Sequence, residues 1–390
     1  MKVMYISTGI LKEDIYPDPN QGGQVQIWGI AKQLEKKGYD VTILKAGNSN
    51  KKEVVDNILL LNVKSKFKQD IFRGIPTQLL FSKKSIKIIK SEKPDILSLQ
   101  FRYSGYFPSK LNIPKIFTLH SPNALDYFKP YAIRHHILNH PYFHFRKIIE
   151  TRLMSNSNWI VVLNKFIENY LKNKGYLNVK MIPNAINPKD FYNKGDDNFI
   201  LYAGRFDWAK RVGILIKAYS MLDKDYRKNF KLKIVGQGNE EQYLKNLVKS
   251  KNIEKNVEFF PWIERKKLIN LMARCSIFVL PSLFEMMPVV VIEVMDCSKP
   301  VISSNIPGPQ DIITHGYDGF LFERGNISEL KRYLELLLED ENLRRKIGKK
   351  ARKTAEEKYT FKKIVERHIS LFNELRVNRI DMSQKSKFYS

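Results

Sequence analysis

Residues 282–293 read SLFEMMPVVVIE and place two glutamates, Glu285 and Glu293, eight positions apart. The short apolar run before them, Ile277 to Leu280, predicts a strand, and the apolar run that carries Glu293 predicts a helix. One carboxylate would then follow the carboxyl end of a strand, where open α/β sheets bind ligands, and the other would lie about two turns into the helix. The alternative is a structural helix with one solvated and one buried acid, although buried glutamates are rare unless paired.

A second strand–turn–helix unit lies upstream. Residues 199–204 read FILYAG, which predicts a buried strand that ends in a glycine turn. Arg205, Lys210 and Arg211 follow, before an amphipathic run over 212–222. Cations are disfavoured at a helix N-terminus, so their position indicates that an anion lies between them. A planar guanidinium and a compact ammonium together suit a diphosphate.

In these residues the chain resembles the retaining glycosyltransferases of family 4, which have the GT-B fold. The family's Glu-x7-Glu motif is matched by Glu285 and Glu293. Its Gly-Arg…Lys motif is matched by Gly204, Arg205 and Lys210. Each motif alone is moderately specific, and their joint order is far more so.

Two weaker matches extend the resemblance to about residues 1–370. A Gly-Gly loop after the first strand is matched by Gly22 and Gly23, and an Ile-Pro-Asn segment is matched by residues 182–184. The resemblance implies an α/β protein of the GT-B fold, with two Rossmann-like doubly wound domains that face each other across a cleft. It implies an acceptor domain over 1–190 and a nucleotide-sugar domain over 191–365. Residues 366–390 would form a helix that crosses back to the first domain, with a loose tail from Met382 to Ser390.

The chain departs from the family pattern around the first glutamate. The family usually has glycine where Met286 stands, and backbone N–H groups in this segment hold the donor, whereas Pro288 has no N–H to offer. A later Gly-Gly pair reads Pro307-Gly308 here, and the acid after it is Asp311 rather than glutamate. These changes leave the reaction class unchanged and affect the choice of sugar.

The resemblance also implies roles for four catalytic residues. Arg205 and Lys210 would neutralise the diphosphate of a nucleotide-sugar as the glycosidic bond breaks, and Glu285 would orient the donor sugar. His120 follows the predicted strand 116–119, so its ring should stand at the ligand edge of the sheet, where the family has a histidine facing the sugar. A purely structural histidine is the alternative.

The remaining donor contacts are expected on both domains. Glu293 would accept hydrogen bonds from the ribose, and Gly204 would end its strand at the diphosphate. Gly22 and Gly23 would let the backbone approach the phosphates. Trp262 and Ile263 follow a predicted strand and would neighbour the base. The leaving phosphate would take the acceptor's proton, so no metal and no further cofactor are expected.

Alternating strand-like and helix-like segments predict parallel sheets covered by helices. The polar stretch 193–198 predicts a hinge between the two halves. The predicted strands are Val3–Ser7, Asp40–Leu44, Asp95–Gln100, Ile116–His120, Trp159–Leu163, Phe199–Ala203, Lys231–Val235, Val257–Phe260, Ile277–Leu280 and Val301–Ser303.

Composition narrows the class of protein. The chain has 390 residues, which suits two or three domains. It contains two cysteines, too few for a disulfide framework or a cysteine-rich metal site. No apolar stretch reaches the roughly 18 residues of a membrane span, and Met1-Lys2-Val3 leads straight into a strand, so we expect a cytoplasmic protein without a cleaved leader.

The net charge of +27 favours anionic partners. Residues 127–152 interleave aromatic and basic side chains, which suits peripheral contact with an anionic membrane or the walls of an acceptor cleft. The same stretch supports a rival class, a nucleic-acid-binding protein that stacks bases and contacts phosphate. No recognised nucleic-acid-binding motif appears, and the acidic residues are mixed with the basic ones.

Three short motifs have structural alternatives. Asp223-Lys224-Asp225 matches a metal-binding pattern but follows a helix, as a solvated turn does. The histidines of 135–144 lack a cysteine or carboxylate at ligand spacing. Gly236 and Gly238 could let a nucleotide approach, although Gly-x-Gly alone is weak.

We therefore expect a retaining transferase that moves a sugar from a nucleotide diphosphate-sugar to a saccharide, lipid-linked or other hydroxyl acceptor. A nucleotide-sugar 2-epimerase of the same fold is the alternative enzyme. Such an epimerase needs further carboxylates near C2 of the sugar, and the chain offers no strong candidates outside the pair already assigned.

Overall fold

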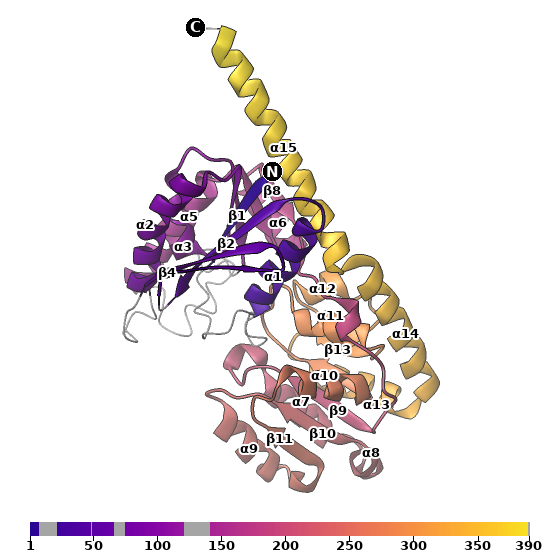
Figure 1. Cartoon of the computed structure of the whole chain (residues 1–390). Helices are drawn as coiled ribbons and strands as arrows, with labels where there is room; N and C mark the ends of the chain where they lie inside the picture. Colours follow the sequence, from indigo (N-terminus) through magenta and orange to yellow (C-terminus); the bar gives the residue numbers. More distant parts are fainter. Residues whose placement is uncertain (8–21, 48, 66–74, 121–140, 389–390) are drawn as a thin grey trace. The chain divides into compact units, whose positions relative to one another are not determined.

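The computed structural model describes residues 1–7, 22–47, 49–65, 75–120 and 141–388. The chain divides into two compact units (Figure 1). Unit 1 contains residues 1–163, 167–183 and 364–390, and unit 2 contains residues 164–166 and 184–363. In each unit a sheet of mostly parallel strands lies between layers of helices. No helix in the part of the chain that is described is both long and apolar enough to cross a membrane.

The described part of unit 1 forms a sheet in the order β3-β4-β2-β1-β5-β6-β7-β8. Its neighbouring strands are parallel except β3 and β4, which pair as an antiparallel hairpin. From β1 the chain adds strands on one side of the sheet, and from β5 it adds them on the other side. The boundary between these two neighbouring strands is therefore the topological switch point. The strands are β1 (Lys2–Ser7), β2 (Asp40–Gly47), β3 (Lys51–Val55), β4 (Ile58–Lys64), β5 (Ile96–Leu99), β6 (Lys115–Leu119), β7 (Trp159–Val162) and β8 (Val179–Met181).

Helices cover both faces of this sheet. Helices α2, α3 and α5 lie on one side, and α1 and α15 lie on the other (Figure 1). They are α1 (Gly22–Glu35), α2 (Ile75–Glu92), α3 (Arg102–Gly105), α5 (Pro141–Ser155), α6 (Lys165–Asn173) and α15 (Phe361–Phe388), with the 3-10 turn η1 (Pro108–Lys110).

Unit 2 forms a parallel sheet in the order β11-β10-β9-β12-β13-β14 among its described residues. Its switch point lies between β9 and β12. Both strands are buried along their whole length, as expected for strands covered on two faces. The strands are β9 (Phe199–Ala203), β10 (Lys231–Val235), β11 (Val257–Phe260), β12 (Ile277–Leu280), β13 (Val301–Ser304) and β14 (Phe320–Phe322).

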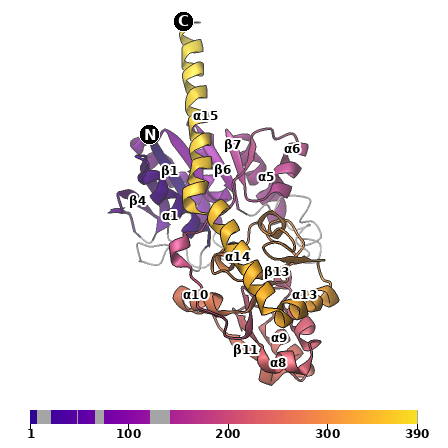
Figure 2. The ribbon, with the colours of Figure 1, turned by 90° about the vertical axis from the view of Figure 1, so that its right-hand side faces the viewer.

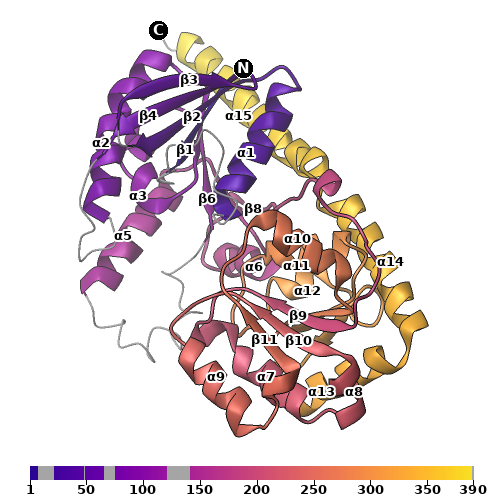
Figure 3. The same cartoon turned by 60° about the horizontal axis from the view of Figure 1, so that its bottom comes forward.

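The helices of unit 2 form two layers. Helices α7, α9 and α13 lie on one face of the sheet, and α10, α11 and α14 lie on the other (Figure 3). Seen from another side, α13 and α14 lie next to each other (Figure 2). The helices are α7 (Val212–Ser220), α8 (Lys224–Asn229), α9 (Glu241–Ser250), α10 (Arg265–Arg274), α11 (Val289–Asp296), α12 (Pro309–Ile312), α13 (Ile327–Glu339) and α14 (Glu341–Lys358), with the 3-10 turns η3 (Pro188–Asp190), η4 (Trp208–Lys210) and η5 (Glu254–Asn256).

All ten predicted strands are confirmed, with bounds that differ by at most three residues at an end. Strands β3, β4, β8 and β14 were not predicted. The β3–β4 hairpin turns at Asp56 and Asn57, which both have positive φ, 49° and 61°. Positive φ at both central residues is typical of a two-residue type I′ hairpin turn, whose usual sequence signal is Asn-Gly or Asp-Gly.

Two local expectations were wrong. The stretch 193–198, predicted as a hinge, lies inside unit 2. Its backbone N–H groups at Lys194 and Asp197 donate to the carbonyls of Ala273 and Arg274. The tail predicted from Met382 is helical through Phe388 as part of α15, because residues 377–388 contain neither glycine nor proline to end the helix.

Candidate functional site

The predicted donor residues of unit 2 lie at the carboxyl ends of β9 and β12, the two strands at the switch point. Gly204 and Arg205 directly follow β9, and Glu285 follows β12 by a short loop. The two loops are joined through their backbones, because Leu283 N donates to Ala209 O (2.7 Å). This edge is where ligands bind in open α/β sheets.

Lys210 and Glu285 contact each other directly. Lys210 Nζ donates to Glu285 Oε1 at 2.6 Å, and the two side chains are only 18% and 10% exposed. Ser282 Oγ donates to the same carboxylate oxygen at 2.7 Å. A partly buried ion pair is strengthened by its low-dielectric surroundings and is held in one geometry by its hydrogen bonds. The ammonium and the carboxylate are therefore both oriented before any ligand arrives.

Arg205 has a different environment from Lys210. Its side chain is 70% exposed, and its guanidinium lies 3.2 Å from the carboxylate of Asp207. The Asp207 side chain also accepts a hydrogen bond from Ala209 N (3.0 Å) and so caps η4, the turn that ends in Lys210. Tyr202 OH donates to Arg205 O (2.9 Å), and burial raises the pKa of this phenol, so it remains a donor. Arg205 thus has a fixed backbone and an accessible charge.

The loop from Glu285 to Pro288, where the chain departs from the family pattern, is anchored by asparagines. Asn164 Nδ2 donates to Met286 O (2.8 Å), and Asn184 Nδ2 donates to Met287 O (3.3 Å). Pro288 is the N-cap of α11, so its missing N–H falls where the helix does not need one. The first N–H groups of α11 have no partner within the helix and can serve an anion.

Gly308 packs against the same loop. It has φ +94° and ψ −72°, a conformation that L side chains rarely adopt. A Cβ at this position would lie 2.8 Å from Met286 O and 3.2 Å from Glu285 O. The glycine of the divergent Pro307-Gly308 pair is therefore required by the path of the donor loop.

Glu293 is buried, 7% exposed, and it is paired. Arg265, the first residue of α10, places its guanidinium 2.8 Å from Glu293 Oε1 and stacks over the ring of Phe191 at 5.6 Å. The predicted carboxylate is thus in place on α11. Its arginine partner was not predicted, although a cation at the start of a helix, the signal used for Arg205, also marks Arg265.

Gly236 is a packing residue. A Cβ there would lie 1.9 Å from Gly204 O, and the loops after β9 and β10 run against each other through the bond from Phe206 N to Gln237 O (2.9 Å). The Gly-x-Gly signal therefore supports the close approach of two loops.

Trp262 and Ile263 follow β11 at the same edge of the sheet. Trp262 is 44% exposed and Ile263 is half-buried. Strand β11 is the edge strand, two strands away from β9. The structure places these two residues at the outer end of the ligand edge.

In unit 1, His120 follows β6 and joins a small polar cluster at the carboxyl edge. His120 Nε2 lies 3.0 Å from Gln100 Oε1, and the Gln100 amide nitrogen donates to Ser98 Oγ (2.7 Å). Since the amide oxygen can only accept, Nε2 carries the proton. Burial lowers the pKa of His120 to about 4, so the ring is neutral at pH 7 and its Nδ1 is an acceptor.

The predicted glycine pair lies beside this cluster. The ring of Phe101 stacks on His120 with centroids 5.3 Å apart, and a Cβ on Gly23 would lie 3.4 Å from the Phe101 ring. Gly22 and Gly23 were expected in a loop but are the first two residues of α1. A helix start leaves its first N–H groups without helical partners, so the pair can still offer backbone donors.

Other candidate motifs have no site role in the structure. Asp223 is the N-cap of α8 and Asp225 lies in its first turn, where both are exposed. Across the described ranges, no cluster of three or more His, Cys, Asp or Glu side chains could hold a metal ion. His135, His136, His140 and the aromatic–basic residues 127–140 lie outside the described residues.

Two family models match this chain, one in each half. Residues 20–190 match the family model "Glycosyltransferase Family 4", and residues 184–354 match "Glycosyl transferases group 1". An uncharacterized glycosyltransferase of Methanocaldococcus jannaschii is 28% identical over 371 residues, which are 94% of this chain and 98% of the relative.

Solved structures show the fold. Sucrose-phosphate synthase from Thermosynechococcus elongatus aligns with a TM-score of 0.80 at 19% identity, over 97% of this chain and 99% of that one. HepE of Anabaena, determined with UDP and glucose, aligns with a TM-score of 0.72 at 15% identity, over 96% and 99% of the two chains. These likenesses confirm the predicted GT-B fold. The matches do not favour the epimerase or the nucleic-acid-binding alternatives.

Proposed function

Because this chain is a glycosyltransferase of the GT-B fold, we propose that it moves a sugar from a nucleotide diphosphate-sugar to a hydroxyl group of a saccharide or lipid-linked acceptor, with retention of the anomeric configuration. The observation that carries the proposal is the Lys210–Glu285 pair, which lies with Arg205 at the switch point of unit 2. Two cations, each with an acidic partner, thus lie where a parallel sheet binds its ligand.

Arg205 and Lys210 act on the leaving group. Negative charge grows on the diphosphate as the bond to the anomeric carbon breaks, and preorganised cations stabilise that charge without having to reorient. Lys210 is already oriented by Glu285, whereas Arg205 is exposed and free to reach the phosphates. These two cations supply the stabilisation that a metal ion provides in other transferases, so no metal is required.

Glu285 has a second role toward the sugar. Lys210 and Ser282 both donate to its Oε1, which leaves Oε2 as an acceptor for sugar hydroxyl groups. The acceptor's proton passes to the departing phosphate oxygen, so the chain needs no separate general base.

Glu293 and Arg265 serve the nucleoside. A ribose diol can donate two hydrogen bonds to the Glu293 carboxylate, whose orientation the Arg265 guanidinium holds. Trp262 and Ile263 supply an apolar surface for the base. The UDP bound in the solved structure of HepE, which has the same fold, is consistent with this assignment.

Unit 1 supplies His120 and the backbone at Gly22 and Gly23. The neutral His120 ring keeps Nδ1 as an acceptor for a sugar hydroxyl group, and its Nε2–H is held by Gln100. The N–H groups at the start of α1 would bind a phosphate oxygen.

The proposal also includes contact with an anionic membrane through α5. Phe145 and Ile148 are 42% and 51% exposed on one face of this helix, with Lys147 and Arg152 also exposed. Apolar side chains beside basic ones suit an anionic lipid surface. Co-sedimentation with phosphatidylglycerol vesicles should exceed that with phosphatidylcholine vesicles and fall in an Ile148→Ser variant. Equal binding to both lipids would exclude this contact.

Single-turnover kinetics on the donor that gives the largest thermal shift tests the main proposal. Lys210→Ala and Arg205→Ala should each lower the transfer rate by roughly 10²-fold or more, the scale of losing one electrostatic donor. Lys224→Ala, which removes an exposed lysine of α8, is the matched control and should leave the rate unchanged. The products should be free nucleotide and a larger saccharide. An epimerised donor, or normal rates in both site variants, would refute the proposal.

A further inference from the structure

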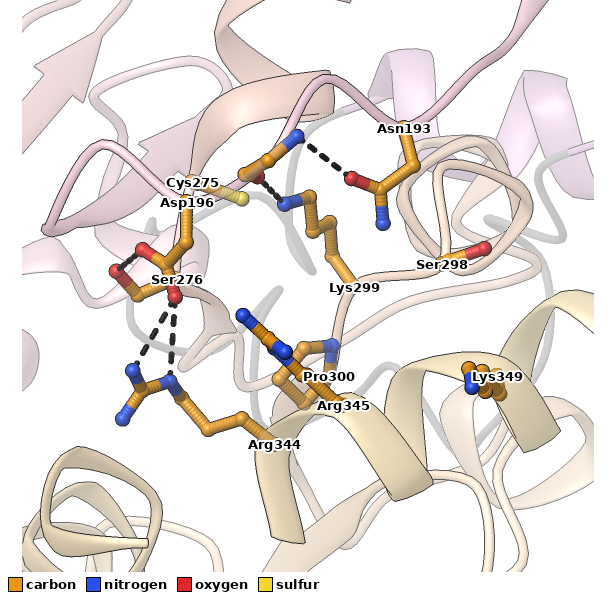
Figure 4. A pocket seen from close by; sticks show the side chains of 11 residues that line it. Asn193, Asp196, Cys275, Ser276, Ser298, Lys299, Pro300, Arg344, Arg345 and Lys349 are labelled. Atoms are coloured by element: carbon orange, nitrogen blue, oxygen red, sulfur yellow. Dashed lines mark hydrogen bonds and ion pairs between the residues drawn. The ribbon is translucent and has the colours of Figure 1, made fainter. Parts of the chain in front are cut away.

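A second cavity lies in unit 2 at the opposite edge of the sheet from the donor residues. It has a volume of about 320 Å³ and is lined by the segments that lead into the amino ends of β9, β12 and β13 (Figure 4). Helix α14 contributes Arg344, Arg345 and Lys349, and the turn before β13 contributes Lys299. Asp196 is the acid among the lining side chains.

Lys299 lies at the base of this cavity as a buried cation without a matching acid. The residue is 4% exposed, and its ammonium donates to the backbone carbonyl of Gly195. Among the described residues no carboxylate lies within ion-pair distance of it. Burial lowers the pKa of Lys299. A buried charge is costly unless it is paired, so an anion in the cavity would remove this cost.

Asp196 does not provide that pairing, because it is already engaged. Its carboxylate lies 3.3 Å from the Arg344 guanidinium and accepts a hydrogen bond from Ser276 Oγ. Arg344 in turn donates to the carbonyls of Leu337 (2.7 Å) and Leu338 (3.0 Å). The Asp196 carboxylate is therefore held by Arg344, as Figure 4 shows, and no carboxylate of the described residues forms an ion pair with Lys299, although the nearby charges of Asp196 and Asp197 raise the pKa of Lys299 and partly offset its burial.

The rim of the cavity adds exposed cations. Lys349 is exposed, with no ion pair in the described chain, and Arg345 is paired only with the exposed Glu341 at 2.5 Å. The wall is rigid, since α14 approaches so closely that a Cβ on Gly348 would lie 2.1 Å from Ser298 O. Ser298 and Asn193 line the same space and add hydrogen-bond donors.

We propose that this cavity is a second binding site, which takes a small phosphate-bearing anion with Lys299 at its base and Lys349 and Arg345 at its rim. A phosphate dianion matches the two cations that lack an acid, and its oxygens suit the surrounding ammonium, guanidinium and hydroxyl donors. The volume lies at the lower end of the roughly 300–1,000 Å³ of small-molecule sites, which favours inorganic phosphate or a small phosphomonoester. The inference is independent of the proposed function.

Thermal unfolding of the full chain, titrated with sodium phosphate at constant ionic strength with chloride as the reference, tests the site. Phosphate should raise the Tm saturably. Lys349→Glu should weaken the apparent affinity by about tenfold or more, the factor for losing one hydrogen bond to a charged group. Lys346→Glu makes the same charge change on the same helix outside the cavity and should have little effect. Lys299→Gln should weaken binding similarly, with folding checked by circular dichroism.

The proposed donor residues could also bind phosphate, so the titration is repeated in Lys210→Ala and with saturating UDP. The phosphate effect should persist in both. If the effect is lost in Lys210→Ala but persists in Lys349→Glu, the phosphate binds at the donor residues and the inference is overturned. The absence of any saturable effect would overturn it as well. Glucose 6-phosphate and glycerol 3-phosphate distinguish the source. Tighter binding than phosphate indicates a phosphomonoester, and equal binding indicates the free ion.

Discussion

Replacement of Gly308 by alanine should disturb the donor loop through a single added atom. The new Cβ would lie 2.8 Å from Met286 O, closer than real Cβ atoms approach a backbone oxygen. That oxygen cannot move freely, because Asn164 Nδ2 is hydrogen-bonded to it at 2.8 Å. The variant therefore has two costs, the strained backbone at φ +94° and the displacement of the loop that carries Glu285.

The magnitude of the first cost can be isolated with a matched control. Gly325 has φ +88° and no atom within 4 Å of a built Cβ, so Gly325→Ala carries backbone strain without a clash. Strain of this kind costs about 1–3 kcal/mol. In a domain of about 150–250 residues each kcal/mol lowers Tm by about 2–4 °C. Gly308→Ala should therefore lower Tm by at least as much as Gly325→Ala, plus the cost of the displaced loop.

The kinetic effect should separate the two variants more clearly. A misplacement of about 1 Å near the reacting groups can cost about 10²-fold in rate, so kcat/KM for the donor should fall on that scale in Gly308→Ala. Gly325→Ala should keep kcat/KM within about twofold of the parent. Calorimetry and initial-rate kinetics on both variants measure these effects. If the two variants match each other in Tm and in kcat/KM, the contact between residue 308 and the donor loop has no functional weight.

Three further predictions concern charged and titratable groups. Arg265→Ala should weaken UDP binding about tenfold in calorimetric titration, because Glu293 loses its 2.8 Å partner; unchanged affinity would remove Arg265 from the site. Asp296 is fully buried with both carboxylate oxygens lacking hydrogen-bond partners in the described chain, and burial raises its pKa to about 7, so stability falls as pH rises from about 4 to 7. Asp296→Asn should then raise stability by roughly 2–4 kcal/mol in denaturant titrations at pH 8 and much less at pH 5, and an equal gain at both would contradict the burial argument. Burial lowers the pKa of His368 and His120 to about 4, so unit 1 should lose stability as pH falls from about 6.5 to 4; His368→Leu should reduce this loss, and an unaltered pH profile would show that His368 does not titrate this way.

Much of the fold could be predicted because buried parallel strands are short apolar runs. Residues 199–203 and 277–280 are apolar throughout, and both are strands with the predicted bounds. The β3–β4 hairpin was missed because its turn is Asp56-Asn57 without glycine. The short strands β8 and β14, each of three residues, are too brief for a periodic pattern.

The candidate site was predictable in its residue types and less so in its contacts. The spacing of Glu285 and Glu293 indicated the ligand edge of a sheet, and the placement of Arg205 and Lys210 indicated an anionic ligand. The partners of these groups come from other elements, as Arg265 on α10 does for Glu293. The roles of Asn164, Gln100 and Gly308 likewise depend on loops that meet only after folding.

Local sequence determined where strands and helices begin. Apolar periodicity, glycine turns and cations at a helix start can each be read from a short segment of the chain. Tertiary structure alone decided which charges meet. Lys210 reaches Glu285, 75 positions away, because β9 and β12 are neighbours in the sheet, although β10 and β11 lie between them in the sequence. Lys299 has no ion-pair partner among the described residues, because Asp196 pairs with Arg344, 148 positions away. Such pairings depend on sheet order and on competition between partners, and a linear pattern contains neither.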